Sequence, residues 1–360
     1  MHGSLRASSV HPVVRVTGNF TSEAPMSAMA RESLLAAFDQ GWADPKKLSQ
    51  ASAKAAILRN QSLENIAHRL GVAAHEIHIL GEPALGHFLA IAGLLTPNSE
   101  FIYCSSDKGK IRAIARTHVG KTTETSVDAN GQIVLPAKPS KDSVLSLQSA
   151  NGETGIIQND LSVFSDVGFI SVDATSSGPR VSLPERWDTA LFDSQSWGGP
   201  SGLALLAIRN TSSYSYPLPR IAPISVPGTY SLPLLIAASI ALENFEIEDM
   251  ALRKSLISEL KAIPEVSVVG ENVLALPHIL SCIVGGVNSE QLVSKLSQRG
   301  FDVDSGSACS PEDLQPSHVL AAMGLPTAGH LRFTLHRTTT QDLIVELVKN
   351  ISEVSAELSR

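Results

Sequence analysis

The sequence predicts an α/β protein with a large, mostly parallel sheet and a smaller α+β part near the C-terminal end. From about residue 85 to residue 210, short apolar runs alternate with polar or helical segments. This alternation is typical of buried parallel strands that are covered by helices on both faces. The chain has 360 residues, of which 43% are hydrophobic and 18% charged. It is therefore an ordinary globular sequence that is long enough for two domains.

Helices are expected first along the chain. Residues 1–20 are expected to form an irregular arm. Helical periodicity then covers Met26–Gln40, which ends at Gly41, and Ser49–Leu70, which ends at Gly71.

Buried strands are expected next, each followed by a loop rich in Gly, Ser or Asp. These strands are Ser143–Leu147, Gly168–Val172, Ala190–Phe192 and Leu203–Ile208. Ligands of such a sheet bind beyond the carboxyl ends of its strands. We therefore expect the site in the loops that follow these strands.

The C-terminal third has a different pattern. After two helices, we expect a strand, a helix, a short strand, a loop, a helix, a strand and a final helix. The segments with clear bounds are Leu232–Phe245, Asp249–Ile263, Ile279–Val284, Ser289–Arg299, Leu331–Leu335 and Gln341–Leu358. The expected division is an arm over residues 1–20, a large α/β domain over 21–240 and a small α+β domain over 241–360.

The charge composition argues against two classes of partner. With 28 basic and 35 acidic residues, the net charge is −7, and the basic residues form no cluster. Binding to nucleic acid or to an anionic membrane therefore has no electrostatic support. The uncharged segment Ile221–Leu242 contains three prolines, so it is a poor membrane span and is expected to be a loop followed by a buried helix.

The cysteines indicate a reducing compartment. Cys104, Cys282 and Cys309 are too few and too widely spaced for a disulfide framework or a zinc site. The histidines share no metal-ligand spacing, so no metal is expected. The first residues also lack the apolar core of a signal peptide, and we expect a cytoplasmic protein.

The most informative segment surrounds Cys309. It reads Asp304-Ser-Gly-Ser-Ala-Cys-Ser310, and it is followed by Gln315-Pro-Ser-His-Val-Leu-Ala-Ala-Met-Gly324 and Leu331-Arg-Phe-Thr-Leu-His-Arg337. This run resembles the loop that carries the sulfur-accepting cysteine of the cysteine desulfurases, members of the class V aminotransferase family. The resemblance covers most of residues 35–350. It implies the type I fold of the pyridoxal phosphate (PLP)-dependent transferases, and a homodimer with sites at the subunit boundary.

Three residues match positions that bind cofactor or substrate in that family. Asp173, in Val172-Asp-Ala-Thr-Ser176, corresponds to the aspartate at the pyridine nitrogen of PLP. Thr229 corresponds to the threonine that reaches the phosphate in the neighbouring subunit. Arg332 corresponds to the arginine that pairs with the substrate α-carboxylate, a bidentate task suited to guanidinium. The alternative for Arg332 is a structural ion pair or a solvent-facing side chain.

Other cofactor positions have changed. Ser196, in Phe192-Asp-Ser-Gln-Ser-Trp-Gly-Gly-Pro-Ser-Gly202, stands where the family has the lysine that holds PLP, and no lysine occurs between Lys141 and Lys254. Pro83 replaces the threonine of the phosphate turn and removes a backbone N–H donor from a helix N-terminus. The remaining replacements are Asp107 for the stacking histidine, Gly152 for an asparagine, Ser176 for a glutamine, and Asp193 and Gln195 beside Ser196. Correlated losses around one ligand indicate that the ligand is gone.

Asp173 then needs another partner. A carboxylate at a buried strand end costs several kcal/mol unless donors or a cation satisfy it. We expect local hydrogen bonds from Thr175, Ser176, Ser177 or water, and a retained ligand is the alternative.

The residues that follow Cys309 do not determine whether its thiol is reactive. Ser310 and Pro311 are typical of a helix start, whose dipole would lower the thiol pKa. Glu312 and Asp313 in the first turn would raise it. A persulfide carrier and a passive loop cysteine are both consistent with this pattern.

The leading hypothesis is a cysteine desulfurase-like protein that has lost PLP catalysis and acts in, or regulates, sulfur transfer or iron–sulfur assembly. It would act as a homodimer, as a heterodimer with an active paralogue, or by presenting Cys309 to a sulfur acceptor. One alternative is an active desulfurase or lyase that binds PLP non-covalently, although losing the lysine removes both proximity and the general base. The other is a small-molecule binding protein in which Asp173 and Arg332 hold an amino acid.

Overall fold

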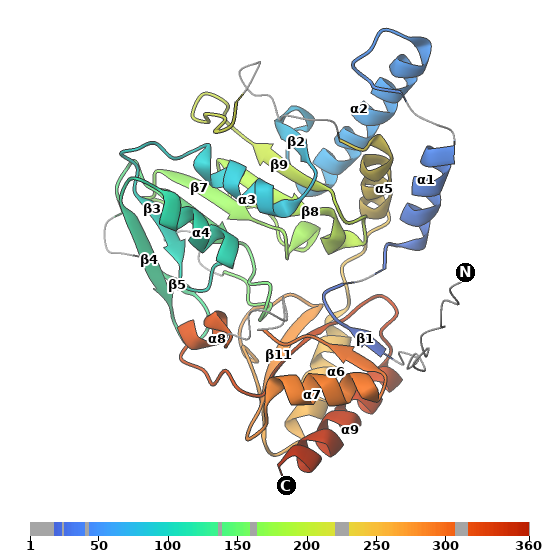
Figure 1. The fold of residues 1–360 in the computed structure, drawn as a ribbon, viewed down its shortest axis with the longest axis vertical. Helices are drawn as coiled ribbons and strands as arrows, with labels where there is room; N and C mark the ends of the chain where they lie inside the picture. Colours follow the sequence, from blue (N-terminus) through green and yellow to red (C-terminus); the bar gives the residue numbers. More distant parts are fainter. Residues whose placement is uncertain are drawn as a thin grey trace, which may run out of the picture.

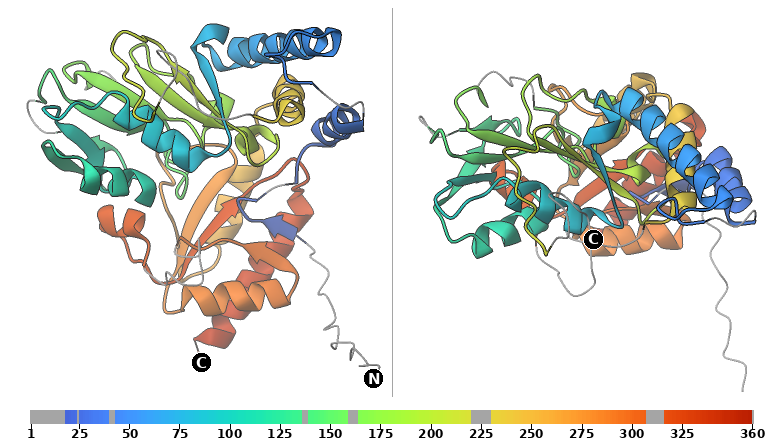
Figure 2. Two further views of the ribbon diagram at one scale, coloured as in Figure 1. Left: turned by 45° about the horizontal axis from the view of Figure 1, so that its top comes forward. Right: turned by 90° about the horizontal axis from the view of Figure 1, so that it is seen from above.

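The computed structural model describes residues 18–23, 25–39, 43–135, 139–158, 164–219, 230–306 and 316–359. Figure 1 shows a large sheet flanked by helices and a second group of elements built from the C-terminal part of the chain. The left view in Figure 2 shows the orange and red C-terminal elements gathered below the large sheet. The predicted α/β fold class is confirmed.

The large sheet has eight strands in the order β2-β9-β8-β7-β6-β3-β4-β5. Strands β4, β3, β6, β7 and β8 run parallel, whereas β9 is antiparallel to β2 and β8, and β5 is antiparallel to β4. The strands are β2 (Ile77–Leu80), β3 (Phe101–Cys104), β4 (Thr122–Val127), β5 (Ile133–Val134), β6 (Val144–Gln148), β7 (Phe169–Asp173), β8 (Thr189–Asp193) and β9 (Ala204–Ile208). The four strands predicted in this region are confirmed.

Helices cover both faces of this sheet. Successive residues of each strand point to opposite sides, so both faces carry apolar side chains that the helices bury. In β8, Ala190 and Phe192 join the core beneath one group of helices, whereas Leu191 joins the core on the other face. The first group is α1 (Ala28–Asp39), α2 (Gln50–Leu70) and α5 (Leu232–Glu243), and the second is α3 (Pro83–Ala92) and α4 (Gly109–Thr117). In the part of the chain that the structure describes, no helix is both long and apolar enough to cross a membrane.

A second, antiparallel sheet has the strand order β10-β11-β13 and its own core. Its strands are β10 (Val266–Val268), β11 (Ile279–Val284) and β13 (His330–Thr334), and the helices around it are α6 (Met250–Lys261), α7 (Ser289–Gln298) and α9 (Gln341–Leu358). The short helix α8 spans His318–Ala322. The domain boundary near residue 240 stays a prediction.

Residues 18–20 correct one expectation. They form strand β1 (Gly18–Phe20) rather than part of an irregular arm, because they pair in parallel with β12 (Phe301–Val303). Phe20 is buried in the core of the second sheet. The N-terminal segment and the C-terminal third are therefore packed together.

Candidate functional site

The parallel strands bring polar residues to one edge of the large sheet. Asp173 is the last residue of β7, paired in register with Gln148 at the end of β6. Asp193 ends β8, and the turn Asp107–Lys108 follows β3. This is the edge at which the sequence predicted a site.

Asp173 is buried and fully engaged by its own chain. Its Oδ1 accepts hydrogen bonds from the backbone N of Thr175 at 3.0 Å and from the Thr175 hydroxyl at 2.6 Å. Its Oδ2 lies 2.9 Å from the Nζ of Lys108, which also donates to the Thr175 hydroxyl. The predicted local hydrogen bonds are confirmed for Thr175, and the ion pair with Lys108 was not predicted.

Electrostatics keep Asp173 ionised. Burial alone would raise its pKa, but the Lys108 ammonium, together with His87 and the Thr175 hydroxyl, holds the pKa well below its usual range. His87, on α3, is itself buried, and burial lowers its pKa to about 4. This edge of the large sheet thus holds a carboxylate and an ammonium side by side, near a neutral imidazole.

The side chain of Asp107 lies against the end of β3, where it accepts a hydrogen bond from the protein backbone. Its Oδ2 accepts a hydrogen bond from the backbone N of Cys104 at 2.9 Å. Its backbone oxygen is 3.0 Å from the Nε2 of His318 at the start of α8. The side chain is buried, and burial raises the pKa of Asp107 to about 7.

The N-terminus of α3 is occupied by a carboxylate. Pro83 is the first residue of the helix, as the sequence predicted. The Glu82 side chain accepts from the backbone N of Ala84 at 2.9 Å and from that of Leu85 at 2.7 Å. These N–H groups are the donors that a helix N-terminus would otherwise offer to a phosphate.

Ser196 is fixed in a short 3-10 helix that follows β8. Its hydroxyl donates to the backbone oxygen of Asp193 at 2.7 Å, and its own backbone oxygen accepts from Arg180 Nη1 at 2.5 Å. Arg180 is in turn paired with Glu248 through Nε and Oε2 at 2.7 Å. The hydroxyl at position 196 therefore has an intramolecular partner.

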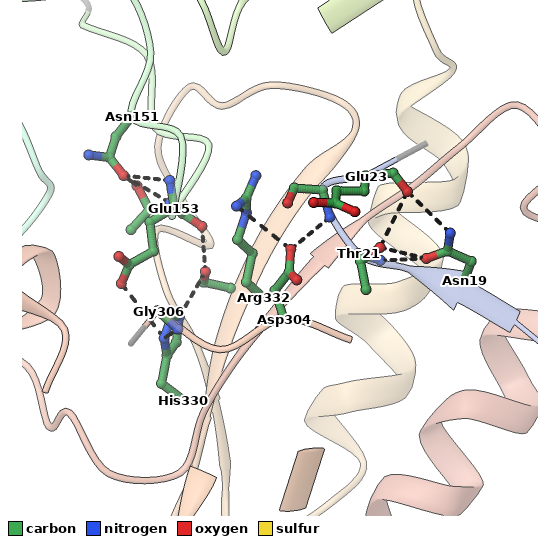
Figure 3. Close-up of polar contacts among 12 residues, drawn as sticks. Asn19, Thr21, Glu23, Asn151, Glu153, Asp304, Gly306, His330 and Arg332 are labelled. Atoms are coloured by element: carbon green, nitrogen blue, oxygen red, sulfur yellow. Dashed lines mark hydrogen bonds and ion pairs between the residues drawn. The ribbon is translucent and has the colours of Figure 1, made fainter. Parts of the chain in front are cut away.

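Arg332 has a carboxylate partner from its own chain (Figure 3). Its Nη1 lies 3.8 Å from Asp304 Oδ2, and the same oxygen accepts from the backbone N of Ser22 at 2.7 Å. The backbones of Arg332 and Asp304 exchange two hydrogen bonds. This arrangement matches the structural ion pair, which was one alternative to a role of Arg332 in binding a substrate carboxylate.

A second polar cluster lies near Arg332, and Figure 3 shows its members Glu153 and His330. Ser281 belongs to the same cluster through its hydrogen bonds to both residues. His330 Nε2 is 3.1 Å from the Ser281 hydroxyl, and His330 Nδ1 is 3.6 Å from Glu153 Oε1. The order Ser–His–Glu is that of a nucleophilic triad, but the hydrogens are placed differently. The Ser281 hydroxyl donates to the Glu153 backbone oxygen at 2.6 Å, and Nδ1 accepts from the backbone N of Gly306 at 2.9 Å. Ser281 is therefore not activated by His330.

Two predicted site residues, Cys309 and Thr229, lie outside the described residues. The other two cysteines, Cys104 and Cys282, are buried. Burial raises the pKa of Cys282 to about 12.

Comparisons with known proteins show which proteins this chain resembles. The family described as Aminotransferase class-V matches residues 224–347. Cysteine desulfurase 2 of Trichormus variabilis is 26% identical over 95% of this chain and 93% of its own length. The NifS cysteine desulfurase of Azotobacter vinelandii is 34% identical over 34% of this chain and 32% of its own length. The chain is thus similar to cysteine desulfurases over nearly its whole length, and its residues 224–347 match the class V aminotransferase family.

Solved structures show the fold. A NifS-like protein has a TM-score of 0.81 at 20% identity, covering 95% of this chain and all of the other (100%). The apo cysteine desulfurase of Thermococcus onnurineus NA1 has a TM-score of 0.79 at 18% identity, covering 95% of each chain. The predicted type I fold of the PLP-dependent transferases is confirmed.

The family depends on PLP, and three features of the chain at this edge of the sheet do not fit that group. Lys108 pairs with the carboxylate that would face the pyridine nitrogen. Glu82 caps the helix N-terminus at the position of the phosphate turn. Ser196, which the sequence resemblance matches to the family's lysine, has a hydroxyl and no amine. Lys108 and Glu82 could not be recognised from the sequence as site residues, because their roles depend on which strand and helix ends meet in the fold.

Proposed function

We propose that this protein is a cysteine desulfurase-like pseudoenzyme that does not perform PLP catalysis and that acts in, or regulates, sulfur transfer or iron–sulfur assembly. The observation that carries the proposal is the ion pair between Lys108 and Asp173, 2.9 Å apart. An internal ammonium supplies the positive charge that Asp173 would otherwise take from a protonated pyridine. The proposal includes a cytoplasmic location.

Charged side chains of this protein disfavour binding of the cofactor at its pyridine ring and at its phosphate. To admit a pyridinium, Lys108 would have to leave Asp173, and separating such a buried pair is strongly unfavourable. To admit a phosphate, Glu82 would have to leave the α3 N-terminus or remain as a like charge beside it. The same partners weaken the amino-acid binding alternative, because Asp173 and Arg332 each face an ion of the chain itself.

The sulfur-transfer part of the proposal depends on Cys309. The sequence around this residue resembles the persulfide-carrying loop of the family, whereas the other two cysteines are buried. Cys309 is thus the thiol that would receive sulfur from an active desulfurase, or pass it to an acceptor. A thiolate attacking a persulfide takes the outer sulfur and releases the donor thiolate, so no additional oxidant or reductant is required.

The absence of PLP catalysis is tested with the purified protein and added PLP. We expect no stable visible absorption band, no spectral change on adding cysteine and no sulfide release. An active cysteine desulfurase serves as the positive control. A coloured protein that responds to cysteine and releases sulfide would favour the non-covalent PLP enzyme and overturn the pseudoenzyme proposal.

The sulfur-transfer role is tested with a persulfide-loaded active desulfurase as donor. We expect one sulfur to appear on the wild-type protein and none on the Cys309→Ser variant. A Cys104→Ser variant is the matched control, because this buried thiol is not expected to react. If the wild-type protein takes up no sulfur from the donor, the carrier role is wrong.

A further inference from the structure

Helix α4 and the turns beside it carry a run of positive charge in an otherwise acidic protein. Residues 108–121 contain five of the 28 basic residues and no acidic residue, although the net charge of the chain is −7. The expectation that the basic residues form no cluster is therefore wrong for this segment. Figure 1 shows α4 beside α3, and both helices pack on the same face of the large sheet.

Two of these five charges are neutralised within the chain. Lys108 pairs with Asp173 at 2.9 Å, and Lys121 pairs with Glu100 at 2.7 Å. The other three have no ion-pair partner among the residues that the structure describes, and they are Lys110, Arg112 and Arg116. We call these three residues the α4 surface.

The α4 surface lies on the solvent side of the helix. The opposite side is buried through Ile111, Ile114 and Ala115. At 3.6 residues per turn, Arg112 and Arg116 lie on one flank of the solvent side and Lys110 on the other. The small residues Gly109 and Ala113 lie between the two flanks, and both are exposed. Long cationic side chains thus border a strip of the helix that another chain can approach.

The immediate surroundings leave this surface positive. The nearby carboxylate of Glu124 accepts from the Tyr103 hydroxyl at 2.9 Å. Burial raises the pKa of Tyr103, as does Glu124, whereas Arg112 and Arg116 act to lower it, so both guanidinium groups lie near this hydroxyl. Val119 follows the helix and adds an apolar side chain that is 82% exposed. The surface therefore combines positive charge with one exposed apolar residue.

This charge pattern does not stabilise the helix that carries it. Arg112 and Arg116 are four residues apart, and like charges at that spacing destabilise a helix. Lys110 lies in the first turn, where the helix dipole disfavours a cation, although Arg116 in the last turn is favoured. Soluble surfaces normally intersperse both signs of charge, whereas α4 contains no acidic residue. A binding role accounts for a pattern that helix stability does not.

The charge of the whole molecule selects the kind of partner. Outside residues 108–121, 23 basic residues stand against 35 acidic ones, a net charge of −12. A nucleic acid or an anionic membrane extends beyond the α4 surface and would be repelled by the rest of the molecule. A short acidic segment feels mainly the charges within a screening length of about 8 Å. The apolar side of α4 is also buried in the protein, so it cannot enter a bilayer.

We propose that the α4 surface is a docking site for an acidic segment of a partner protein. The acidic side chains pair with Lys110, Arg112 and Arg116, and an apolar residue of the segment packs on Val119. The proposal does not depend on the proposed function, because it requires neither the absence of PLP catalysis nor sulfur transfer.

The test uses the full-length protein and a fluorescent peptide of glutamate and leucine residues. We expect titrations followed by fluorescence anisotropy to show binding that weakens about tenfold when NaCl is raised from about 50 mM to about 500 mM. Arg112→Glu/Arg116→Glu should weaken binding at low salt by about tenfold or more. Hydrogen exchange of the wild-type complex should show protection within residues 109–119. A peptide that does not bind at low salt, or that protects another region, would show that the proposal is wrong.

Lys46→Glu/Lys47→Glu is the matched control, because these two lysines are exposed in the turn before α2 and the change in net charge is the same. We expect it to weaken binding by less than about twofold. Equal weakening by both double variants would mean that the peptide responds to net charge and not to α4. Urea unfolding checks that the variants are folded. Lys110→Gln, a milder change on the other flank, should weaken binding by about threefold and decides the matter if the α4 double variant unfolds.

Two other polyanions test the class of partner. Vesicles that contain phosphatidylserine and a single-stranded DNA oligonucleotide are titrated under the same conditions. We expect neither to bind as tightly as the peptide. Tighter binding of either one, abolished by Arg112→Glu/Arg116→Glu, would overturn the protein partner and assign the α4 surface to that polyanion.

Discussion

Lys108 reaches Asp173 from a turn that follows a different strand, and this contact determines what the cleft can bind. The sequence predicted that Asp173 would need a donor and suggested the hydroxyl groups that follow it. Thr175 has that role, but the charge is balanced by Lys108. A local pattern can predict a neighbour two residues away, whereas the ion pair depends on the order β7-β6-β3 in the sheet, which hydrophobic periodicity does not encode.

The first prediction concerns this ion pair. Lys108→Met leaves a buried carboxylate with only the Thr175 donors, and we expect it to lower the free energy of unfolding at pH 7 by about 2–3 kcal/mol. The value is at the lower end for a broken buried pair because the Lys108 side chain is 31% exposed. Urea unfolding measures the loss. Adding Asp173→Asn should recover part of it, because no uncompensated charge remains.

The pH dependence of the same comparison has a defined sign. The folded-state pKa of Asp173 is held below its unfolded value of about 4. The stabilisation is therefore complete above that value and is lost as the pH falls below it. The difference between wild type and Lys108→Met should narrow on acidification from about pH 5 to pH 3. A difference that stays constant would mean that Asp173 is not the residue that Lys108 stabilises.

The second prediction concerns Asp107, whose pKa shift has the opposite sign. Burial raises its pKa to about 7, so between its unfolded value of 3.8 and about 7 the folded protein holds a proton that the unfolded chain has released. Stability should therefore fall as the pH rises through this window. Asp107→Asn keeps an oxygen for the backbone N of Cys104 and cannot ionise. We expect it to match wild type near pH 4 and to exceed it by about 2–4 kcal/mol above pH 7. Parallel pH profiles would contradict this.

At the scale of elements, the helix ends show which boundaries can be predicted from the sequence and which cannot. Periodicity from Ser49 and the stop at Gly71 predicted α2 with nearly its observed bounds. In the structure, Ser49 is the N-cap and accepts from Ser52 N at 3.0 Å, and Gly71 ends the helix at φ 70°. Both signals are local and have a known geometry. At α3, Pro83 gave the correct start, but the cap is Glu82, a residue with weak capping preference. Its role became visible only in the structure.

The third prediction tests this cap. Glu82→Ala removes the acceptor for the backbone N–H groups of Ala84 and Leu85, and we expect it to lower the free energy of unfolding by about 1 kcal/mol. Glu82→Gln keeps one acceptor oxygen without the charge and should lose less. Denaturant unfolding of the three proteins gives the comparison. A Glu82→Ala variant as stable as wild type would show that the contact does not stabilise α3.

At the scale of the whole molecule, the sequence predicted a large α/β part, a smaller α+β part and a site at strand ends, because these follow from periodicity and from the direction of parallel strands. It did not predict that residues 18–20 form a strand paired with β12, or that Gly306 and His330 meet. Those contacts join segments that are remote in sequence and that carry no shared pattern. The predicted homodimer, or heterodimer with a paralogue, depends likewise on surfaces that only the fold assembles, and it stays a prediction.

The fourth prediction tests the dimer at helix α1. Of the 12 residues of α1, only Ala30 is buried, and Leu35 and Phe38, one turn apart, are 47% and 52% exposed. Large apolar side chains that remain exposed on an amphipathic helix are typical of an interaction surface. We expect the wild-type protein to sediment as a dimer, and Phe38→Glu to weaken association by about tenfold or more without lowering monomer stability.

Val345→Glu on α9 is the matched control, because Val345 has a similar exposure of 47% on a helix in the other part of the molecule. A charge there should leave the sedimentation of the dimer unchanged, since general effects of a new carboxylate on solubility are the same for both variants. If wild type sediments as a monomer over the whole concentration range, the homodimer is wrong, and the α1 surface must be tested with an active desulfurase as partner. If both variants weaken the dimer equally, α1 is not the interface.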